Sequence, residues 1–185
     1  MSTDQPPRFR FSPNAYNLGL FVADDGVCAA CEQPRTLRYT ASFYAVDRPG
    51  YLCPWCVANG TAARVFGGEF CDSETIEGFA ADPGAARSTD ATEVREVATR
   101  TPSYPSWQQE VWLAHCGRPC AFLGFVGAQD LPRYLGEPDF AADVDGGAGF
   151  PGETVRRYLS PGGDLAGYLF QCLTCHRHRL HVDAA

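Results

Sequence analysis

The spacing of nine cysteines is the feature that most limits how this 185-residue chain can fold. Eight of them form four short pairs, and Cys71 stands alone. The pairs are Cys28 with Cys31, Cys53 with Cys56, Cys116 with Cys120, and Cys172 with Cys175. A short pair on a tight turn directs two sulfurs at one ion about 2.3 Å away, and two pairs complete a tetrahedron. The pattern therefore predicts two Zn²⁺ ions, each bound by four cysteines, and an ordinary buried thiol at Cys71.

The cellular compartment bears on this reading of the cysteines. The N-terminal region contains no continuous apolar segment, and no apolar run approaches the roughly 18 residues that a membrane helix needs. We therefore expect a cytoplasmic protein without membrane insertion. Thiols stay reduced in the cytoplasm, which favours metal ligands over a disulfide framework. Hydrophobic residues make up 45% of the chain, which is enough for a packed core.

The first two pairs nearly match the spacing of zinc-ribbon proteins. Between them, residues 37–44 are rich in aromatic and β-branched residues and predict a strand. Residues 57–66 then predict a short helix, and Pro54 suits a first helical position because its missing N–H costs nothing there. A cysteine pair on a turn, a hairpin, a second cysteine pair and a helix thus follow one another, which is the order of a treble clef. We expect an α+β fold of small zinc-centred modules, of treble-clef or zinc-ribbon type, in which short antiparallel hairpins accompany short helices.

The second predicted site must join two pairs across 51 residues, and no local motif enforces this. An interleaved arrangement, first pair with third and second with fourth, stays open beside the sequential one. Four histidines lie near these cysteines and could also bind metal: His115, His176, His178 and His181. Because four cysteines already fill a closed site, we expect these histidines to be solvated or to lie outside the set of metal ligands. The sequence of residues 172–176 also matches C-x-x-C-H, the haem-attachment pattern, but haem attachment requires export, for which the sequence shows no signal. The same C-x-x-C could be a thioredoxin-like redox motif, but that motif requires a βαβ context that the sequence does not show.

The rest of the chain suggests two modules joined by a connector. We expect a first zinc module at residues 1–80, an acidic connector at 81–97 and a second zinc module at 98–185. Residues 80–86 resemble a linker, and residues 89–99 have helical character. In the second module we expect a buried strand at 120–127, a short helix at 128–135, an acidic glycine-rich loop at 139–152 and a C-terminal hairpin with the last cysteine pair at its turn.

A capping-box pattern at Ser106, with Gln109 three residues on, predicts a helix that runs to about residue 114. It would carry two tryptophans and two glutamines directly before a zinc pair. These residues are Trp107, Gln108, Gln109 and Trp112. They serve either packing and capping or a recognition surface.

Taken together, these motifs resemble the CbrC family, small bacterial proteins whose name is tied to colicin tolerance. The resemblance covers nearly the whole chain. It rests on residues 7–13, the Cys28 pair, residues 39–40, residues 52–63, residues 99–102 with 106–109, and the Cys116 pair. It implies a zinc-associated cytoplasmic protein and supplies no catalytic residue.

Three classes of function follow from these features. Two closed cysteine sites leave no open coordination position, which favours a non-enzymatic binding protein in a bacterial stress or toxin-tolerance response. A formal charge of −7, made more negative by zinc-bound thiolates, suits a basic protein partner and makes nucleic acid an unfavourable one. An enzyme that uses zinc or a thiol remains the alternative, and a histidine or water on either zinc would support it.

Overall fold

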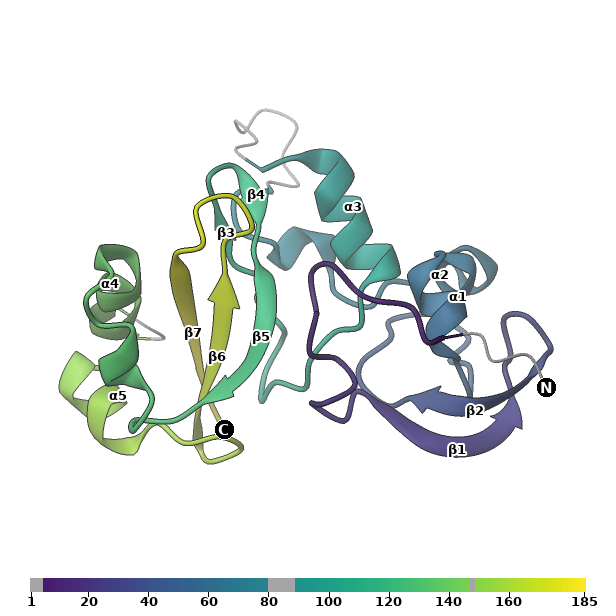
Figure 1. Cartoon of the computed structure of the whole chain (residues 1–185), viewed down its shortest axis with the longest axis horizontal. Coiled ribbons are helices and arrows are strands. Elements are labelled where there is room, and N and C mark those ends of the chain that lie inside the picture. Colours follow the sequence, from purple (N-terminus) through teal and green to yellow (C-terminus); the bar gives the residue numbers. More distant parts are fainter. Residues whose placement is uncertain (1–4, 80–88, 147–148) are drawn as a thin grey trace. The chain divides into compact units, whose positions relative to one another are not determined.

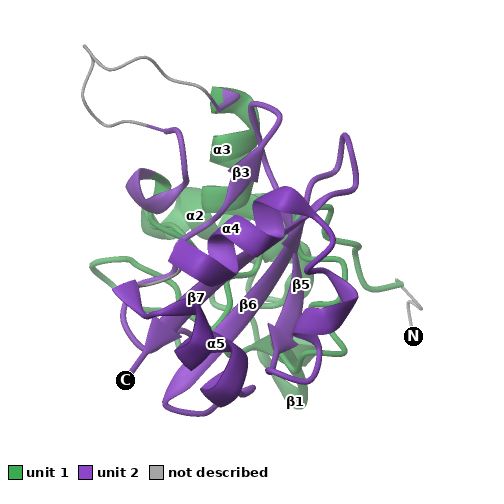
Figure 2. Cartoon of the chain, turned by 90° about the vertical axis from the view of Figure 1, so that its left-hand side faces the viewer, with its two compact units in different colours: residues 1–73, 91–105 green, residues 74–90, 106–185 purple. Residues whose placement is uncertain are grey.

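The computed structural model describes residues 5–79, 89–146 and 149–185 (Figure 1). The segment 80–86, which resembles a linker in sequence, lies outside these residues. The chain divides into two compact units, one of residues 1–73 and 91–105 and the other of residues 74–90 and 106–185 (Figure 2). These bounds differ from the expected modules at 1–80 and 98–185. The helix expected at 89–99 forms as α3 (Ala91–Arg100) and belongs to the first unit, so the chain enters that unit twice.

The first unit contains an antiparallel hairpin of β1 (Phe21–Val27) and β2 (Pro34–Tyr39). The pairing is irregular between Ala23 and Gly26. A Cβ at Gly26 would lie 2.6 Å from the ring of Tyr51, so only glycine leaves room for this ring. The Tyr51 hydroxyl donates to carbonyl oxygens of both strands, at 2.6 Å to Asp24 and 3.1 Å to Arg35. Tyr51 thereby fixes the end of the hairpin from which the first cysteine pair emerges.

Two short helices follow the second cysteine pair. As predicted, Pro54 starts α1 (Pro54–Ala58). The single helix expected at 57–66 is interrupted, and α2 (Thr61–Phe66) begins after Gly60. Gly60 has a left-handed conformation with φ of 74°, which ends the first helix at little steric cost.

Aromatic side chains and cysteines share the core of the first unit. Phe9 stacks on Phe21 at 5.4 Å between ring centroids, and Tyr39 meets Phe70 edge-on at 5.3 Å. Three cysteines of the first two pairs are buried in the same cluster: Cys28, Cys53 and Cys56. α3 closes this core, because the carbonyl of Ala98 accepts the backbone N–H of Phe70 at 2.7 Å.

The second unit is built on a three-stranded antiparallel sheet in the order β5 (Ala121–Val126), β6 (Leu165–Gln171) and β7 (His178–Ala184). A small hairpin of β3 (Ala114–His115) and β4 (Arg118–Pro119) precedes it. Helices α4 (Pro138–Gly146) and α5 (Gly152–Tyr158) cover one face of the sheet (Figures 1 and 2). Two 3₁₀ turns complete the described elements, η1 (Ser73–Thr75) at the boundary between the units and η2 (Leu131–Arg133) in the second.

These elements confirm a mixed fold of helices and small antiparallel sheets, including the strand after Cys120 and the C-terminal hairpin. Two local predictions were wrong. The expected loop at 139–152 instead contains most of α4, and the helix expected at 128–135 is reduced to η2.

The helix predicted from Ser106 is also absent, because a distant residue replaces its cap. The Asp183 carboxylate of β7 accepts the backbone N–H groups of Trp107 and Gln108, at 2.8 and 3.0 Å. Downstream, Trp112 forms a parallel bridge to Ile76. Long-range pairing thus takes the backbone groups that a helix would have used.

Candidate metal centres

The first two cysteine pairs meet in the first unit and form a four-sulfur group, which we call the first centre. The Sγ atoms of all its members lie within 4.8 Å of one another. Its members are Cys28, Cys31, Cys53 and Cys56. Three of these residues are buried and Cys31 is partly exposed. Four sulfurs at this separation match the donor set of a closed tetrahedral zinc site.

A tight turn at the end of β1 positions the first pair. The backbone N–H of Cys28 donates to the carbonyl of Gln33 at 3.0 Å, and the N–H of Glu32 donates to the carbonyl of Cys28 at 2.8 Å. Glu32 has a positive φ of 55°, which reverses the chain directly after Cys31. The second pair lies at the start of α1, where the Cys53 N–H points at the Cys28 Sγ at 3.4 Å. Both pairs therefore face one point.

The thiols of the first centre differ in acidity. A hydrogen bond from the Cys53 thiol lowers the pKa of Cys28 to about 4 and, in return, raises the pKa of Cys53. Burial raises the pKa of Cys56 to about 12. Without a metal, one thiolate is thus stabilised by neighbouring thiols that stay protonated. A bound Zn²⁺ would supply the positive charge that allows all four sulfurs to ionise.

An arginine lies beside the first centre. The Arg35 guanidinium stacks over the Trp55 ring, with 4.6 Å from its central carbon to the ring centroid, and its Nε is buried. Burial works to lower the pKa of Arg35, but a hydrogen bond with Cys31 and the charge on Cys53 raise it above its usual value. Arg35 can therefore offset part of the negative charge of a zinc-bound thiolate cluster. Arg35 is not among the site residues predicted from the sequence, and only its position on the strand after the first cysteine pair could have suggested it.

The second group of donor atoms, the second centre, lies in the second unit. It combines one histidine with three cysteines, whose ligand atoms also lie within 4.8 Å of one another. Its members are His115, Cys116, Cys172 and Cys175. The Sγ atoms of Cys116 and Cys175 are 3.7 Å apart. Two sulfurs on a tetrahedral zinc, each about 2.3 Å from the ion, lie about 3.8 Å apart. This spacing thus suits two ligands of one ion.

The turn that carries Cys172 and Cys175 repeats the first turn closely. The Cys172 N–H donates to the carbonyl of Arg177 at 2.8 Å, and the His176 N–H donates to the carbonyl of Cys172 at 3.0 Å. His176 has a positive φ of 61°, as Glu32 does in the first turn. Although burial opposes ionisation, backbone N–H groups of the turn lower the pKa of Cys172 to about 6. Each centre thus contains one turn of the same construction, which we call a knuckle.

The β3–β4 hairpin supplies the other half of the second centre. His115 pairs with Arg118, and the two residues between them, Cys116 and Gly117, have φ values of 54° and 71°. Two successive positive φ values are typical of the type I′ turn, which connects tightly paired strands. The turn places the His115 Nδ1 at 3.2 Å from the Sγ atoms of both Cys116 and Cys175.

The expected ligand Cys120 does not belong to this group. Its N–H donates to the carbonyl of Leu113 at 2.9 Å, which extends the hairpin pairing and draws Cys120 into the interior. The Cys120 side chain is fully buried at the start of β5, and burial raises the pKa of its thiol. His115 was expected to be solvated or to lie outside the ligand set, although it directly precedes Cys116.

The other three histidines have different surroundings. The His178 Nδ1 lies 2.8 Å from a carboxylate oxygen of Glu137. His181 stacks on Tyr168 at 5.7 Å, and burial lowers its pKa. The exposed His176 lies in the knuckle and contributes its carbonyl to Gln171. None of these three belongs to either group of candidate metal ligands among the described residues.

The four residues considered for recognition separate in the structure. Trp112 is fully buried, and its Nε1 donates to the carbonyl of Cys120 at 2.8 Å. Trp107 is 50% exposed, and Gln108 and Gln109 line a pocket of about 490 Å³. Trp112 therefore serves packing, whereas the other three remain accessible to a partner.

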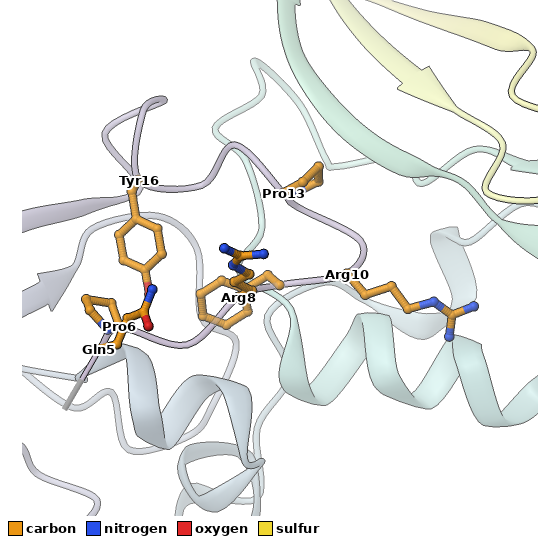
Figure 3. Close-up of a pocket in the computed structure, with 7 residues that line it drawn as sticks. Gln5, Pro6, Arg8, Arg10, Pro13 and Tyr16 are labelled. Carbon is orange, nitrogen blue, oxygen red and sulfur yellow. The ribbon is translucent and has the colours of Figure 1, made fainter.

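A further pocket of about 700 Å³ lies near the start of the chain in the first unit (Figure 3). Arg8 and Tyr16 border it, while the Arg10 side chain points toward α3 and pairs with Glu93 and Glu96. The Tyr16 hydroxyl donates to the carbonyl of Pro7 at 2.8 Å. None of the pocket's lining residues belongs to either centre.

Comparison with known proteins places the chain among bacterial relatives. Residues 6–184 match the model of a family described as uncharacterised protein family UPF0167. UPF0167 protein Mb2317 of Mycobacterium bovis is 37% identical over 183 residues, covering 97% of this chain and 94% of the relative. UPF0167 protein PA1536 of Pseudomonas aeruginosa is 37% identical over 182 residues, covering 96% of each.

No solved structure matches the chain significantly. The helices in the described part of the chain are all too short or too polar to cross a membrane. A match over nearly the full length, together with relatives at this level of identity, shows that the chain belongs to the UPF0167 family.

Proposed function

We propose that the protein binds two Zn²⁺ ions, one at each centre, and acts as a non-enzymatic binding protein in the bacterial cytoplasm. The observation that carries the proposal is the meeting of four donor atoms within 4.8 Å at each of two places. Four protein ligands complete a tetrahedron and leave no coordination position for a substrate, as in structural zinc sites. The two ions would then stabilise a surface for a partner.

The donor chemistry favours zinc. Thiolates are soft ligands that select zinc, copper(I) or iron–sulfur clusters, and a mixed set of three thiolates with one imidazole is common for structural zinc. All nine cysteines lie in the described part of the chain and none forms a disulfide. The first centre would carry four thiolates, and the second would carry three with a neutral imidazole.

A basic protein is the partner that the charge favours. The chain has 22 acidic and 15 basic residues, all of the latter arginine, and zinc-bound thiolates would make it still more acidic. Trp107 offers an exposed aromatic side chain of a type that is enriched at interface centres, and Gln108 and Gln109 add amide groups next to it in the sequence. The resemblance to colicin-tolerance proteins suggests a toxin-tolerance or stress response as the setting.

Metal analysis of the full chain tests the zinc proposal. We expect two zinc ions per chain by mass spectrometry, and two thiols that react only after denaturation, those of Cys71 and Cys120. Denaturation with a chelator should expose all nine. One zinc per chain would remove the second centre from the proposal, and none would overturn it.

The partner proposal has a separate test. A basic protein captured by the purified chain should bind saturably, and Trp107→Ala should weaken that binding at unchanged zinc content. Glu153→Ala, an exposed change in α5, is the control. Equal binding by both variants would reject this surface.

The histidine at the second centre is the one observation that favours an enzyme. Catalytic zinc keeps three protein ligands and one water. Because His115 joins three cysteines here, the group is closed with four protein ligands. A zinc-bound water detected at the second centre would reverse this preference.

A further inference from the structure

We infer that Asp139 is a positioning residue of the second centre: it holds the His115 ring so that Nδ1, and not a sulfur of Cys120, supplies the fourth ligand. The inference rests on the proposed binding of zinc at this centre. In this arrangement His115 binds through Nδ1, carries its proton on Nε2 and donates a hydrogen bond from that N–H to the Asp139 carboxylate.

The two ring nitrogens of His115 face different groups. Nδ1 lies 3.2 Å from the Sγ atoms of both Cys116 and Cys175, while Nε2 lies 3.3 Å from a carboxylate oxygen of Asp139. On a tetrahedral zinc, a nitrogen and a sulfur lie about 3.6 Å apart, so Nδ1 needs only a small shift to bind. A neutral imidazole carries one proton. If Nε2–H donates to Asp139, the lone pair of Nδ1 is free for the metal.

Asp139 is itself held by the second knuckle. Its Oδ2 accepts a hydrogen bond from Arg177 Nη1 at 3.1 Å, and Arg177 follows Cys175 by two residues. The same Oδ2 atom lies 3.3 Å from His115 Nε2, so Arg177 and His115 meet at one carboxylate oxygen. The knuckle that supplies two sulfurs therefore also anchors the group that orients the histidine.

A second contact fixes the start of α4, where Asp139 lies. The Glu137 carboxylate accepts the backbone N–H of His178 at 2.6 Å and lies 2.8 Å from His178 Nδ1. These contacts join the residue before α4 to the first residue of β7. The position of Asp139 is thus set by the sheet as well as by Arg177.

This arrangement has a chemical consequence for the metal. Carboxylates that accept the second N–H of a ligating histidine fix its orientation and raise its basicity, and their loss typically costs 10- to 100-fold in metal affinity. A site of three thiolates and one imidazole carries a net charge one unit less negative than a four-thiolate site. Asp139 returns part of that negative charge from outside the coordination sphere.

Zinc competition with a chromophoric chelator on the full chain tests the inference. Asp139→Ala should weaken zinc binding at the second centre about 10- to 100-fold and leave the first centre unchanged. The matched control is Asp145→Ala, in the same helix, whose carboxylate pairs with Arg156 at 2.7 Å. Equal affinities for both variants and the unaltered chain would overturn the inference.

A second set of variants separates positioning from a general structural role. In the cobalt-substituted protein, the sulfur-to-cobalt charge-transfer band reports the number of thiolates. His115→Cys should raise the band by one thiolate and make zinc affinity insensitive to Asp139→Ala, because no imidazole remains to be oriented. If Asp139→Ala lowers the zinc affinity of the His115→Cys variant as much as that of the unaltered chain, Asp139 acts only through the fold and the inference fails.

Cys120→Ala distinguishes the two candidate ligands. The variant should keep two zinc ions and an unchanged charge-transfer band. Loss of the second ion from Cys120→Ala, with retention in His115→Ala, would assign the ligand to Cys120 and overturn the inference. If the unaltered chain binds no ion at the second centre, the proposed function fails there, and the failure is distinct from that of the inference.

Discussion

The two centres share one knuckle construction but differ in what surrounds it. Cys28, Cys53 and Cys56 are 0–2% exposed and belong to an aromatic core, whereas Cys116 and Cys175 of the second centre are exposed. A buried ligand cannot exchange its metal without local unfolding, while an exposed sulfur is open to chelators and oxidants. If both centres bind zinc, we therefore expect one local motif to hold two ions that exchange at different rates.

The charges around the centres differ as well. The first centre has four sulfurs with the Arg35 guanidinium beside them. The second has three sulfurs and an imidazole, with the Asp139 carboxylate behind it. The more negative set of ligands thus has a cation beside it, and the less negative set has an anion beside it.

Loss of one ligand should have its largest effect in the first centre. Structural zinc contributes about 10–16 kcal/mol in small domains, against about 5–15 kcal/mol of total stability for an ordinary domain. Cys53→Ser should therefore unfold the first unit, because Cys53 is part of its core. Hydrogen exchange followed by mass spectrometry should show lost protection in β1, β2 and α3. The matched variant Cys175→Ser should keep that protection. Unchanged protection of β1, β2 and α3 in Cys53→Ser would show that the first unit does not depend on this ligand.

Zinc release should occur in two phases. We expect a chelator to remove the ion of the second centre at least about tenfold faster, because two of its sulfurs are accessible without local unfolding. Stopped-flow absorbance of a chromophoric chelator measures both phases. Cys116→Ala should abolish the fast phase alone. A single phase for the unaltered chain would show that exposure does not control release.

Neutralising Arg35 should destabilise the first centre moderately. Without the guanidinium beside Cys31, repulsion among thiolates is less compensated, and we expect the slow phase of zinc release to accelerate about three- to tenfold in Arg35→Gln. Arg35→Lys keeps a positive charge and should therefore release zinc more slowly than Arg35→Gln. The control is Arg38→Gln on the same strand, where Arg38 pairs with Asp24 at 2.6 Å. Equal acceleration in this control would assign the effect to the strand and not to the cation.

The smallest expected effect tests the likeness of the two knuckles. Glu32 and His176 occupy the same position with φ values of 55° and 61°, a conformation that glycine adopts without steric cost. Glu32→Gly and His176→Gly should each raise the free energy of unfolding by about 0.5–1 kcal/mol in chemical denaturation. A gain at one position only would show that the knuckles differ in strain.

Much of each centre could be predicted because a knuckle is local. The C-x2-C spacing fixes where a turn must form, and the hairpin around residues 172–175 follows from two strand-like segments on either side. The start of α1 at Pro54 is equally local. In these places the sequence neighbours are also the spatial neighbours.

The rest depended on distant residues. The capping pattern at Ser106 fails because Asp183, 76 residues after Trp107, takes the backbone groups. The acidic segment before residue 147 forms α4, whose start is fixed by contact between Glu137 and His178. The choice between Cys120 and His115 depends on a type I′ turn that C-x3-C spacing does not specify. None of these partners is recognisable from local composition.

The double entry of the chain into the first unit has a consequence for synthesis. The Tyr39 hydroxyl accepts the backbone N–H of Ser103 at 3.0 Å, and Phe70 pairs with Ala98, so residues before 73 depend on residues after 90. A ribosome that has exposed only the first 80 residues has released all four sulfurs of the first centre but not the helix that closes its core. A zinc ion bound by these sulfurs would therefore be captured before the fold around it is complete, and its burial would be finished only when residue 105 has emerged.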